Sequence, residues 1–166
     1  MAIINKKVFA LVIISVFLIV GFFILSKPSK NLTLEIIEPP QIVRQANNIK
    51  YVLVAGQKIK VDLAINQEEK NQGLSGRLSL DEGTGMLFIF ENSARYAFWM
   101  KDMNFNIDII WIGENFEIAY IKKDAKPESF PEAFTPNRDA KYILEVPAGF
   151  SDKYNLKESD KVEFLF

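Results

Sequence analysis

The sequence IDIIWIGENFEIAYIK at positions 107–122 contains the pattern that most directly indicates the fold. Residues 107–112 form an apolar run rich in isoleucine, which is typical of a buried strand. Residues 116–122 form a second strand-like run, and the short segment Gly113-Glu114-Asn115 between them is typical of a tight hairpin loop. We therefore predict an antiparallel hairpin here, within a mainly β domain.

The sequence on both sides of this hairpin repeats the short-strand pattern. Further strands are predicted at residues 51–54, 58–63, 86–90, 97–100, 141–146 and 161–166. Asn66 and Glu69 have the spacing of a capping box, which predicts a short helix over 67–72 that stops at Gly73. A second short helix is predicted over 149–154. About eight strands and two short helices predict an antiparallel β sandwich or barrel-like domain over residues 50–166.

Most of these strands are separated by short turns, so a parallel α/β fold is not expected. The exception is residues 124–140, a long connection with three prolines and two phenylalanines. A connection of this length without regular structure is typical of a lid, a binding loop or a packed Ω-loop. Gly83 and Gly85 precede the strand at 86–90, and we expect them to permit positive φ in the turn that starts it.

The first 25 residues differ in character from the rest of the chain. Lys6 and Lys7 precede an apolar run over residues 8–25. A helix of this length measures about 27 Å, which is close to the hydrocarbon thickness of a bilayer. The run is longer than the apolar core of a signal peptide and ends without an Ala-x-Ala cleavage pattern. We therefore predict an uncleaved transmembrane helix as a membrane anchor within residues 1–25, followed by a proline-containing tether over residues 26–49.

The flanking charges give a weaker indication of orientation. Two lysines lie on each side of the apolar run, so their number alone does not orient it. The free amino terminus adds positive charge to the first side, which favours a cytoplasmic N-terminus. The sequence thus predicts a single-pass membrane protein whose domain lies outside the cytoplasm, with the membrane as a partner through residues 8–25.

The chain contains neither cysteine nor histidine. Their absence excludes disulfides, thiolate nucleophiles, Ser-His-Asp triads and almost every catalytic zinc site. Without the four lysines that flank the apolar run, the chain has 16 basic and 21 acidic residues. A net negative charge disfavours a surface that neutralises phosphates. We therefore predict no nucleic-acid partner, no cofactor and no metal site.

Five motifs occur in a characteristic order and spacing. They are GLSGR at 73–77, GMLFIF at 85–90, FWMKDM at 98–103, IDII at 107–110 and YILEVPAG at 142–149. In this order they resemble the bacterial and archaeal family called domain of unknown function 192, over residues 50–166. The resemblance implies a small, mainly β domain, often behind a signal or membrane anchor, with no established biochemical activity. The sequence departs from the family at Ser75, where similar proteins usually have methionine, and at residues 158–160, which replace a Gly-Asp turn.

The strand at 97–100 has large apolar side chains on both faces. Phe98 and Met100 are expected on one face and Trp99 on the other. Both faces are packed in a core, or one of them lines an aromatic ligand cleft. Arg77 and Lys101 are candidate binding residues; the planar guanidinium of Arg77 is suited either to a surface ion pair or to holding an anionic group.

Asp108 and Glu145 are carboxylates within predicted strands. Asp108 interrupts an apolar run, and because a buried carboxylate requires a partner, Arg77 or Lys101 is expected to pair with it. Glu145 alternates with its apolar neighbours Leu144 and Val146, so we expect it to face away from them. A solvated position would account for Glu145 without any further role.

These residues predict three alternative functions. The first is non-catalytic binding of a polar small molecule, a glycan or an envelope protein in a cleft framed by Arg77, Trp99, Lys101, Asp108 and the 124–140 loop, with Glu145 as a further candidate. The second is a structural or assembly role through strand addition. The third is a carboxylate-dependent hydrolase, which requires that Asp108 and Glu145 face one cavity. No residue is predicted to be catalytic.

Overall fold

The computed structural model describes residues 46–166 of the chain. The predicted membrane anchor over residues 1–25, and the tether as far as residue 45, lie outside the described residues. Within residues 46–166, no helix combines the length and the apolar character that crossing a membrane requires.

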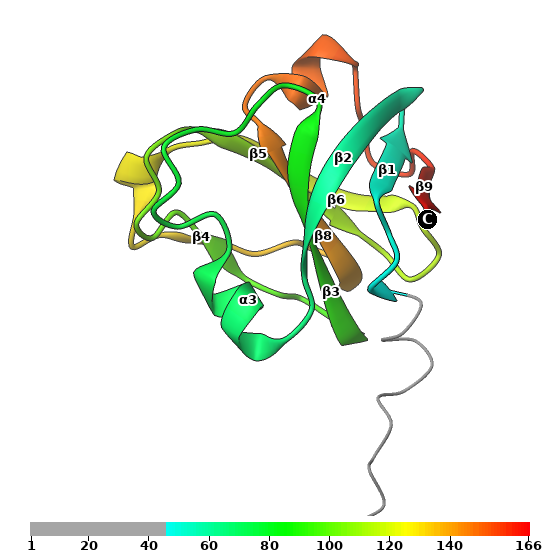
Figure 1. Cartoon of the computed structure of the whole chain (residues 1–166), viewed down its shortest axis with the longest axis horizontal. Coiled ribbons are helices and arrows are strands. Elements are labelled where there is room, and N and C mark those ends of the chain that lie inside the picture. The colour runs from blue at the N-terminus through cyan, green and yellow to red at the C-terminus, as the bar shows by residue number, and fades with distance from the viewer. Residues whose placement is uncertain (1–45) are drawn as a thin grey trace, which may run out of the picture. The chain divides into compact units, whose positions relative to one another are not determined.

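Seven strands form one curved sheet in the order β6-β5-β8-β3-β2-β1-β9 (Figure 1). Their bounds are β1 Tyr51–Val54, β2 Gln57–Ala64, β3 Thr84–Ala94, β5 Ile107–Ile112, β6 Ile118–Ala125, β8 Ala140–Pro147 and β9 Val162–Leu165. Neighbouring strands are antiparallel except β2 and β3, which are parallel. The chain between β2 and β3 crosses over through α3 (Gln67–Gln72) and residues 73–83, as a parallel pair requires. The prediction of a mainly β domain is confirmed, but the predicted sheet was entirely antiparallel, whereas β2 and β3 are parallel.

The two outer strands of the sheet meet at one end, which makes the domain barrel-like. Ile118 N donates to Asp160 O at 2.9 Å, and Ser159 N donates to Ile118 O at 2.8 Å. Glu117 and Lys161 form an isolated antiparallel bridge and an ion pair of 2.8 Å. Part of the edge that an open sheet would expose is therefore already paired.

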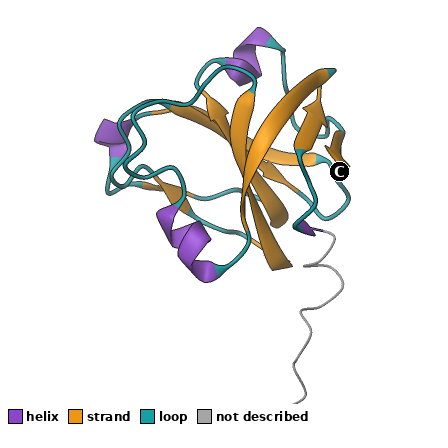
Figure 2. Ribbon diagram, viewed as in Figure 1, coloured by secondary structure: helices purple, strands orange, loops and turns teal. Residues whose placement is uncertain are grey.

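The remaining elements lie around this sheet (Figure 2). β4 (Phe98–Trp99) and β7 (Ala133–Phe134) form a separate two-stranded sheet. The short helices are the 3-10 turn η1 (Pro127–Ser129) and α4 (Phe150–Lys153). The 124–140 connection therefore contains the end of β6, η1 and β7, and is more regular than the sequence indicated.

The buried side chains divide between the two faces of the sheet. Ile110 and Val146 belong to one apolar cluster, whereas Ile109 and Trp111 belong to the other. Successive residues of a strand point to opposite faces, so a strand with both faces covered is apolar throughout. Both faces of β5 are covered in this way, so all six of its residues are buried, and all but Asp108 are apolar.

The predicted hairpin and capped helix are confirmed. β5 has the predicted bounds, and the loop after it closes through a hydrogen bond from Gly113 N to Glu117 O at 2.9 Å. Asn66 Oδ1 accepts from Glu69 N at 2.8 Å, and Glu69 Oε2 accepts from Asn66 N at 3.0 Å, which is the reciprocal pair of a capping box. Gly73 ends α3 with a φ of 50°.

The two glycines before β3 have different roles. Gly83 has a φ of 76°, as predicted, whereas Gly85 has no positive φ. A Cβ on Gly85 would lie 2.6 Å from the carbonyl oxygen of Glu145. Gly85 therefore permits the close approach of β3 and β8, and the expectation of a positive φ there was wrong.

Candidate functional site

A cleft of about 740 Å³ lies over the face of β3 and β8 that carries Phe88 and Glu145, within the usual size range of small-molecule sites. One wall is α3 with the turn that follows it, and the other is residues 96–103. The buried lining residues Leu74, Phe88 and Glu145 form the floor. The remaining lining residues are Gln67, Lys70, Asn71, Gln72, Gly73, Ser75, Gly76, Phe90, Tyr96, Ala97, Phe98, Trp99, Lys101, Asp102 and Met103.

Two hydrogen bonds join the walls to each other. Ser75 Oγ donates to Lys101 O at 2.8 Å, and Gly76 N donates to Asp102 O at 2.8 Å. Asn104 Nδ2 adds a third link by donating to Arg77 O at 2.8 Å. These bonds hold the turn after α3 against residues 101–104, so the spacing of the walls is fixed by the fold.

Aromatic rings make up much of the wall opposite α3. Phe98 packs edge-on against Phe88, with ring centroids 4.9 Å apart. Tyr96 stacks on Phe90 at 3.6 Å, and Lys70 Nζ lies 4.6 Å from the centre of the Phe90 ring. The ammonium group of Lys70 therefore occupies an aromatic face that would otherwise attract a cation.

The strand at 97–100 follows the predicted alternation in burial, although both Phe98 and Trp99 line the cleft. Met100 is buried and Phe98 packs in the core cluster, whereas Trp99 is 56% exposed and lines the cleft. The ring of Phe130 contacts Trp99 at 5.9 Å, and β7 pairs with β4. The 124–140 segment therefore supports Trp99 but does not line the cleft, contrary to the prediction that it frames the site.

Glu145 is buried, with 5% of its surface exposed, so the expectation of a solvated position was wrong. Its register with Met86 and Ile109 places it on the face that carries Phe88, where the crossover segment and residues 96–103 cover the sheet. Within the described residues, Glu145 Oε2 has no hydrogen-bond partner. Burial raises the pKa of Glu145 to about 8, against a smaller opposing effect of the Arg77 guanidinium. Glu145 is therefore mainly a neutral carboxylic acid at pH 7.

Asp108 is also fully buried, but neither Arg77 nor Lys101 is its partner. Its Oδ1 accepts from Asp124 N at 2.9 Å and Gly149 N at 3.3 Å, and its Oδ2 accepts from Ser151 N at 2.7 Å. The predicted ion pair was wrong because backbone N–H groups of two neighbouring segments satisfy the carboxylate. Asp108 joins β5 to β6 and α4, and it does not line the cleft.

Arg77 lies beside the cleft and does not line it. Its Nη1 donates to Asp62 Oδ2 at 2.8 Å, with both side chains partly exposed. Of the five candidate residues, the fold brings Trp99, Lys101 and Glu145 together in the cleft and leaves Arg77 and Asp108 outside it.

Asp108 and Glu145 lie on opposite faces of the sheet. Asp108 is paired with Val146 and Ile109 with Glu145, and paired residues share a face. The two carboxyl groups therefore do not face one cavity. Across residues 46–166, no three acidic side chains converge in a way that would hold a metal ion.

The polar wall of the cleft was not predicted from the sequence. Gln67, Asn71 and Gln72 line it from α3, a helix with no buried residue. The signal was present in the sequence of the helix, QEEKNQ, because six residues without an apolar side chain cannot cover a core.

The described residues thus define a small barrel-like β domain with a cleft that combines aromatic rings, amide side chains and a buried acid. The model of the DUF192 family, described as "Uncharacterized ACR", matches residues 50–164, and the chain belongs to this family.

Two solved structures share the fold. A protein of unknown function from Novosphingobium aromaticivorans matches with a TM-score of 0.66 and 27% identity, over 69% of this chain and 84% of that chain. A Sinorhizobium meliloti protein, whose description proposes a transcription regulator, matches with a TM-score of 0.64 and 26% identity, over 69% of this chain and 90% of that chain. No curated protein matches the chain.

Proposed function

We propose that this domain binds a small polar organic molecule in the cleft between α3 and β4 without transforming it. The observation that carries the proposal is the buried carboxyl of Glu145, which lines the cleft and whose Oε2 is unpaired within residues 46–166. Leaving a buried polar atom unpaired costs about 1–3 kcal/mol. A ligand would recover this free energy if rotation of the carboxyl group turned Oε2 towards the cleft, and this favours an occupied cleft.

The surrounding side chains suit recognition more than chemistry. Trp99 and Tyr96 provide apolar surface, and the amides of α3 provide hydrogen-bond donors and acceptors at the opposite wall. A hydrolase would need a second acid that works together with Glu145. Asp108 is on the other face of the sheet, and Asp102, the other acid of the lining, is exposed to solvent and is not buried as Glu145 is. Binding without catalysis is therefore the function that the geometry favours.

Two other functions, assembly by strand addition and DNA binding, receive less support. Strand addition would need free sheet edges, and the starts of β6 and β9 already bond to each other. DNA binding, as the description of the Sinorhizobium protein would suggest, needs a basic surface. Beyond Lys30 this chain has more acidic than basic residues, 21 against 16, which disfavours DNA binding. Ligand binding in the cleft is therefore better supported than either of these two functions.

The test is a fragment screen on the full chain, reconstituted in lipid nanodiscs. The indole N–H signal of Trp99 reports on binding by NMR, because Trp99 lines the cleft. The other tryptophan of the chain, Trp111, is buried and its indole donates to Tyr96 O at 2.9 Å. We expect polar fragments to shift the Trp99 signal and to lose this effect in Glu145→Leu, a variant that removes the unpaired acid and is expected to fold.

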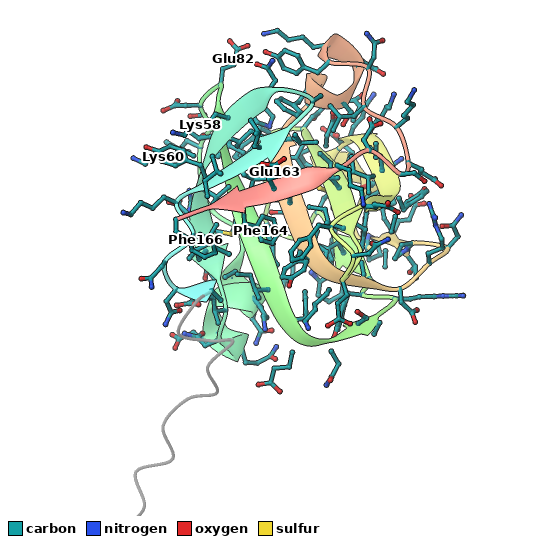
Figure 3. All side chains as sticks on the ribbon, turned by 90° about the vertical axis from the view of Figure 1, so that its right-hand side faces the viewer. Lys58, Lys60, Glu82, Glu163, Phe164 and Phe166 are labelled. Atoms are coloured by element: carbon teal, nitrogen blue, oxygen red, sulfur yellow. The ribbon has the colours of Figure 1, made fainter. Side chains whose placement is uncertain are left out.

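Glu163→Gln is the matched control, since Glu163 lies on β9, on the side of the domain turned away from α3 and β4 (Figures 1 and 3). It should bind like the wild type. The proposal fails if no fragment of any class shifts the Trp99 signal, or if the fragments that do so bind Glu145→Leu equally well.

A further inference from the structure

The lining of the cleft also indicates which class of molecule it takes, provided that the cleft is a binding site as proposed above. Its most exposed large ring is Trp99, which is 56% exposed and is supported from one side by Phe130. A flat aromatic surface of this kind stacks on the apolar face of a ring-shaped ligand. The ligand therefore has at least one flat apolar face.

The polar groups of the cleft are mainly uncharged. Gln67 Nε2 donates to Asn71 Oδ1 at 2.7 Å, and this bond leaves Gln67 Oε1 as an acceptor and Asn71 Nδ2 as a donor for a ligand. Gln72 Nε2 donates to Ser75 O at 2.8 Å, which leaves Gln72 Oε1 as a further acceptor. The raised pKa of Glu145, about 8, makes its carboxyl a donor and an acceptor at pH 7. Groups that both donate and accept, as hydroxyls do, fit this mixture.

The charges on the lining disfavour an organic cation. Lys70 and Lys101 line the cleft, and the ammonium of Lys70 already occupies the Phe90 ring. Asp102 lies next to Lys101 in the chain and offsets its charge. With Glu145 neutral, these three groups leave only a small net positive charge, so neither a cation nor a strong anion is favoured.

We infer that the ligand is a neutral saccharide of one or two rings, stacked on Trp99, with its hydroxyls on the α3 amides and on Glu145. The hydroxyl groups match donors and acceptors at one wall, and the C–H face of the sugar ring matches the indole at the other. A cleft of about 740 Å³ has room for a ligand of this size.

The experiment titrates the full chain in nanodiscs that contain no glycolipid and no maltoside detergent. The probes are glucose, galactose, N-acetylglucosamine and their β-1,4-linked disaccharides, with glucuronate as an anionic probe and choline as a cationic probe. The shifts of the Trp99 indole signal and of the backbone amide signals of Gln72 and Gly73, which line the same cleft, give the dissociation constant. For the Trp99 variants, the amide signals alone give it. The backbone amide of Glu163 serves as the internal reference, because Glu163 is an exposed residue of β9 and does not line the cleft.

We expect at least one neutral saccharide to bind more tightly than glucuronate and choline. Trp99→Ala should weaken its binding by about tenfold or more, and Trp99→Phe by less, because a smaller ring still stacks. Glu145→Gln should bind within about threefold of the wild type because the amide still donates and accepts, whereas Glu145→Leu should lose binding. Melting temperatures near that of the wild type verify that each variant is folded.

The possible failures are distinguishable. If charged or purely apolar fragments bind the cleft and no neutral saccharide does, the saccharide inference is overturned and the proposed binding function stands. If no compound of any class shifts the Trp99 signal, both are overturned. Saccharide binding that Trp99→Ala leaves unchanged would also overturn the inference, because the ligand would then lie elsewhere.

Discussion

Asp108 and Glu145 lie on neighbouring strands, one register position apart, and their environments are opposite. The Asp108 carboxylate accepts three backbone N–H groups, whereas Glu145 Oε2 has no partner within the described residues. Backbone N–H groups satisfy the oxygens of Asp108, whereas burial raises the pKa of Glu145 to about 8. Asp108 is therefore suited to a structural role and Glu145 to a role in the cleft.

The buried carboxyl of Glu145 should make the stability of the domain depend on pH. Burial raises the pKa of Glu145 from 4.5 to about 8, so the native state keeps a proton that the unfolded chain has released. The free energy of unfolding should therefore fall as pH rises between these two values, by up to about 1.4 kcal/mol per pH unit. Glu145→Gln should flatten this dependence and be more stable than the wild type at pH 8, as measured by urea unfolding from pH 5 to pH 8.

Glu163→Gln again provides the control, because Glu163 is an exposed residue of β9. It should keep the slope of the wild type. The other charged groups near Glu145, which are Arg77, Lys70, Lys101 and Asp102, are unchanged in both variants. Equal slopes in the wild type and Glu145→Gln would contradict the buried neutral acid.

The second prediction concerns Asp108. Asp108→Asn keeps one acceptor oxygen and places an NH₂ group against at least one backbone N–H that the carboxylate now accepts. We expect the free energy of unfolding to fall by about 2–4 kcal/mol, measured by urea unfolding at pH 7. Asp139→Asn, which removes an exposed ion pair of 3.6 Å with Arg95, should change it by less than about 1 kcal/mol. Similar losses of unfolding free energy in the two variants would show that the hydrogen bonds of Asp108 stabilise the fold no more than an exposed ion pair does.

Among the elements, α3 depends on its caps more than on packing, because none of its residues is buried. Asn66→Ala removes the side chain that accepts from Glu69 N. The loss should lower the free energy of unfolding by about 1 kcal/mol, and it should weaken binding in the cleft because α3 is one wall. Thermal unfolding and the NMR titration measure the two effects.

Glu68→Ala is the control for α3, because Glu68 is an exposed residue of the same first turn that does not line the cleft. It should leave ligand affinity unchanged and lower the free energy of unfolding by about 0.5 kcal/mol at most. If Asn66→Ala binds ligand like the wild type, the capped helix does not position the wall.

For the molecule as a whole, the predicted arrangement is an anchored domain outside the cytoplasm. Residues 8–25 carry no charge, and a helix of this length is sufficient to span a bilayer. In cells that express the full chain, we expect the protein to stay in the membrane fraction after carbonate washing. The domain should be digested by protease added to intact spheroplasts, and replacing Leu18 and Ile19 by arginine should release the chain from the membrane. A protein that is protected from protease until the cells are lysed would contradict this orientation.

The sequence by itself determined most of the elements, because their signals are local; η1 and β7 were not predicted. The period-two runs, the capping box at Asn66 and Glu69 and the Gly113–Asn115 turn depend on residues a few positions apart, and the structure has all of them. The same alternation correctly separated exposed Trp99 from buried Met100, although Phe98 lines the cleft together with Trp99. Local spacing fixes backbone hydrogen bonding and side-chain direction, so no long-range information was needed.

Only the tertiary structure decided what the polar residues contact. Asp108 was expected to pair with Arg77 or Lys101, and it bonds instead to backbone groups 16 to 43 positions away. Glu145 was expected to face away from Leu144 and Val146, with a solvated position as one interpretation, but the crossover from α3 to β3 and residues 96–103 cover that face as well. Alternation tells which face a side chain occupies, whereas burial depends on which distant segment covers that face, and this is why the cleft emerged only from the fold.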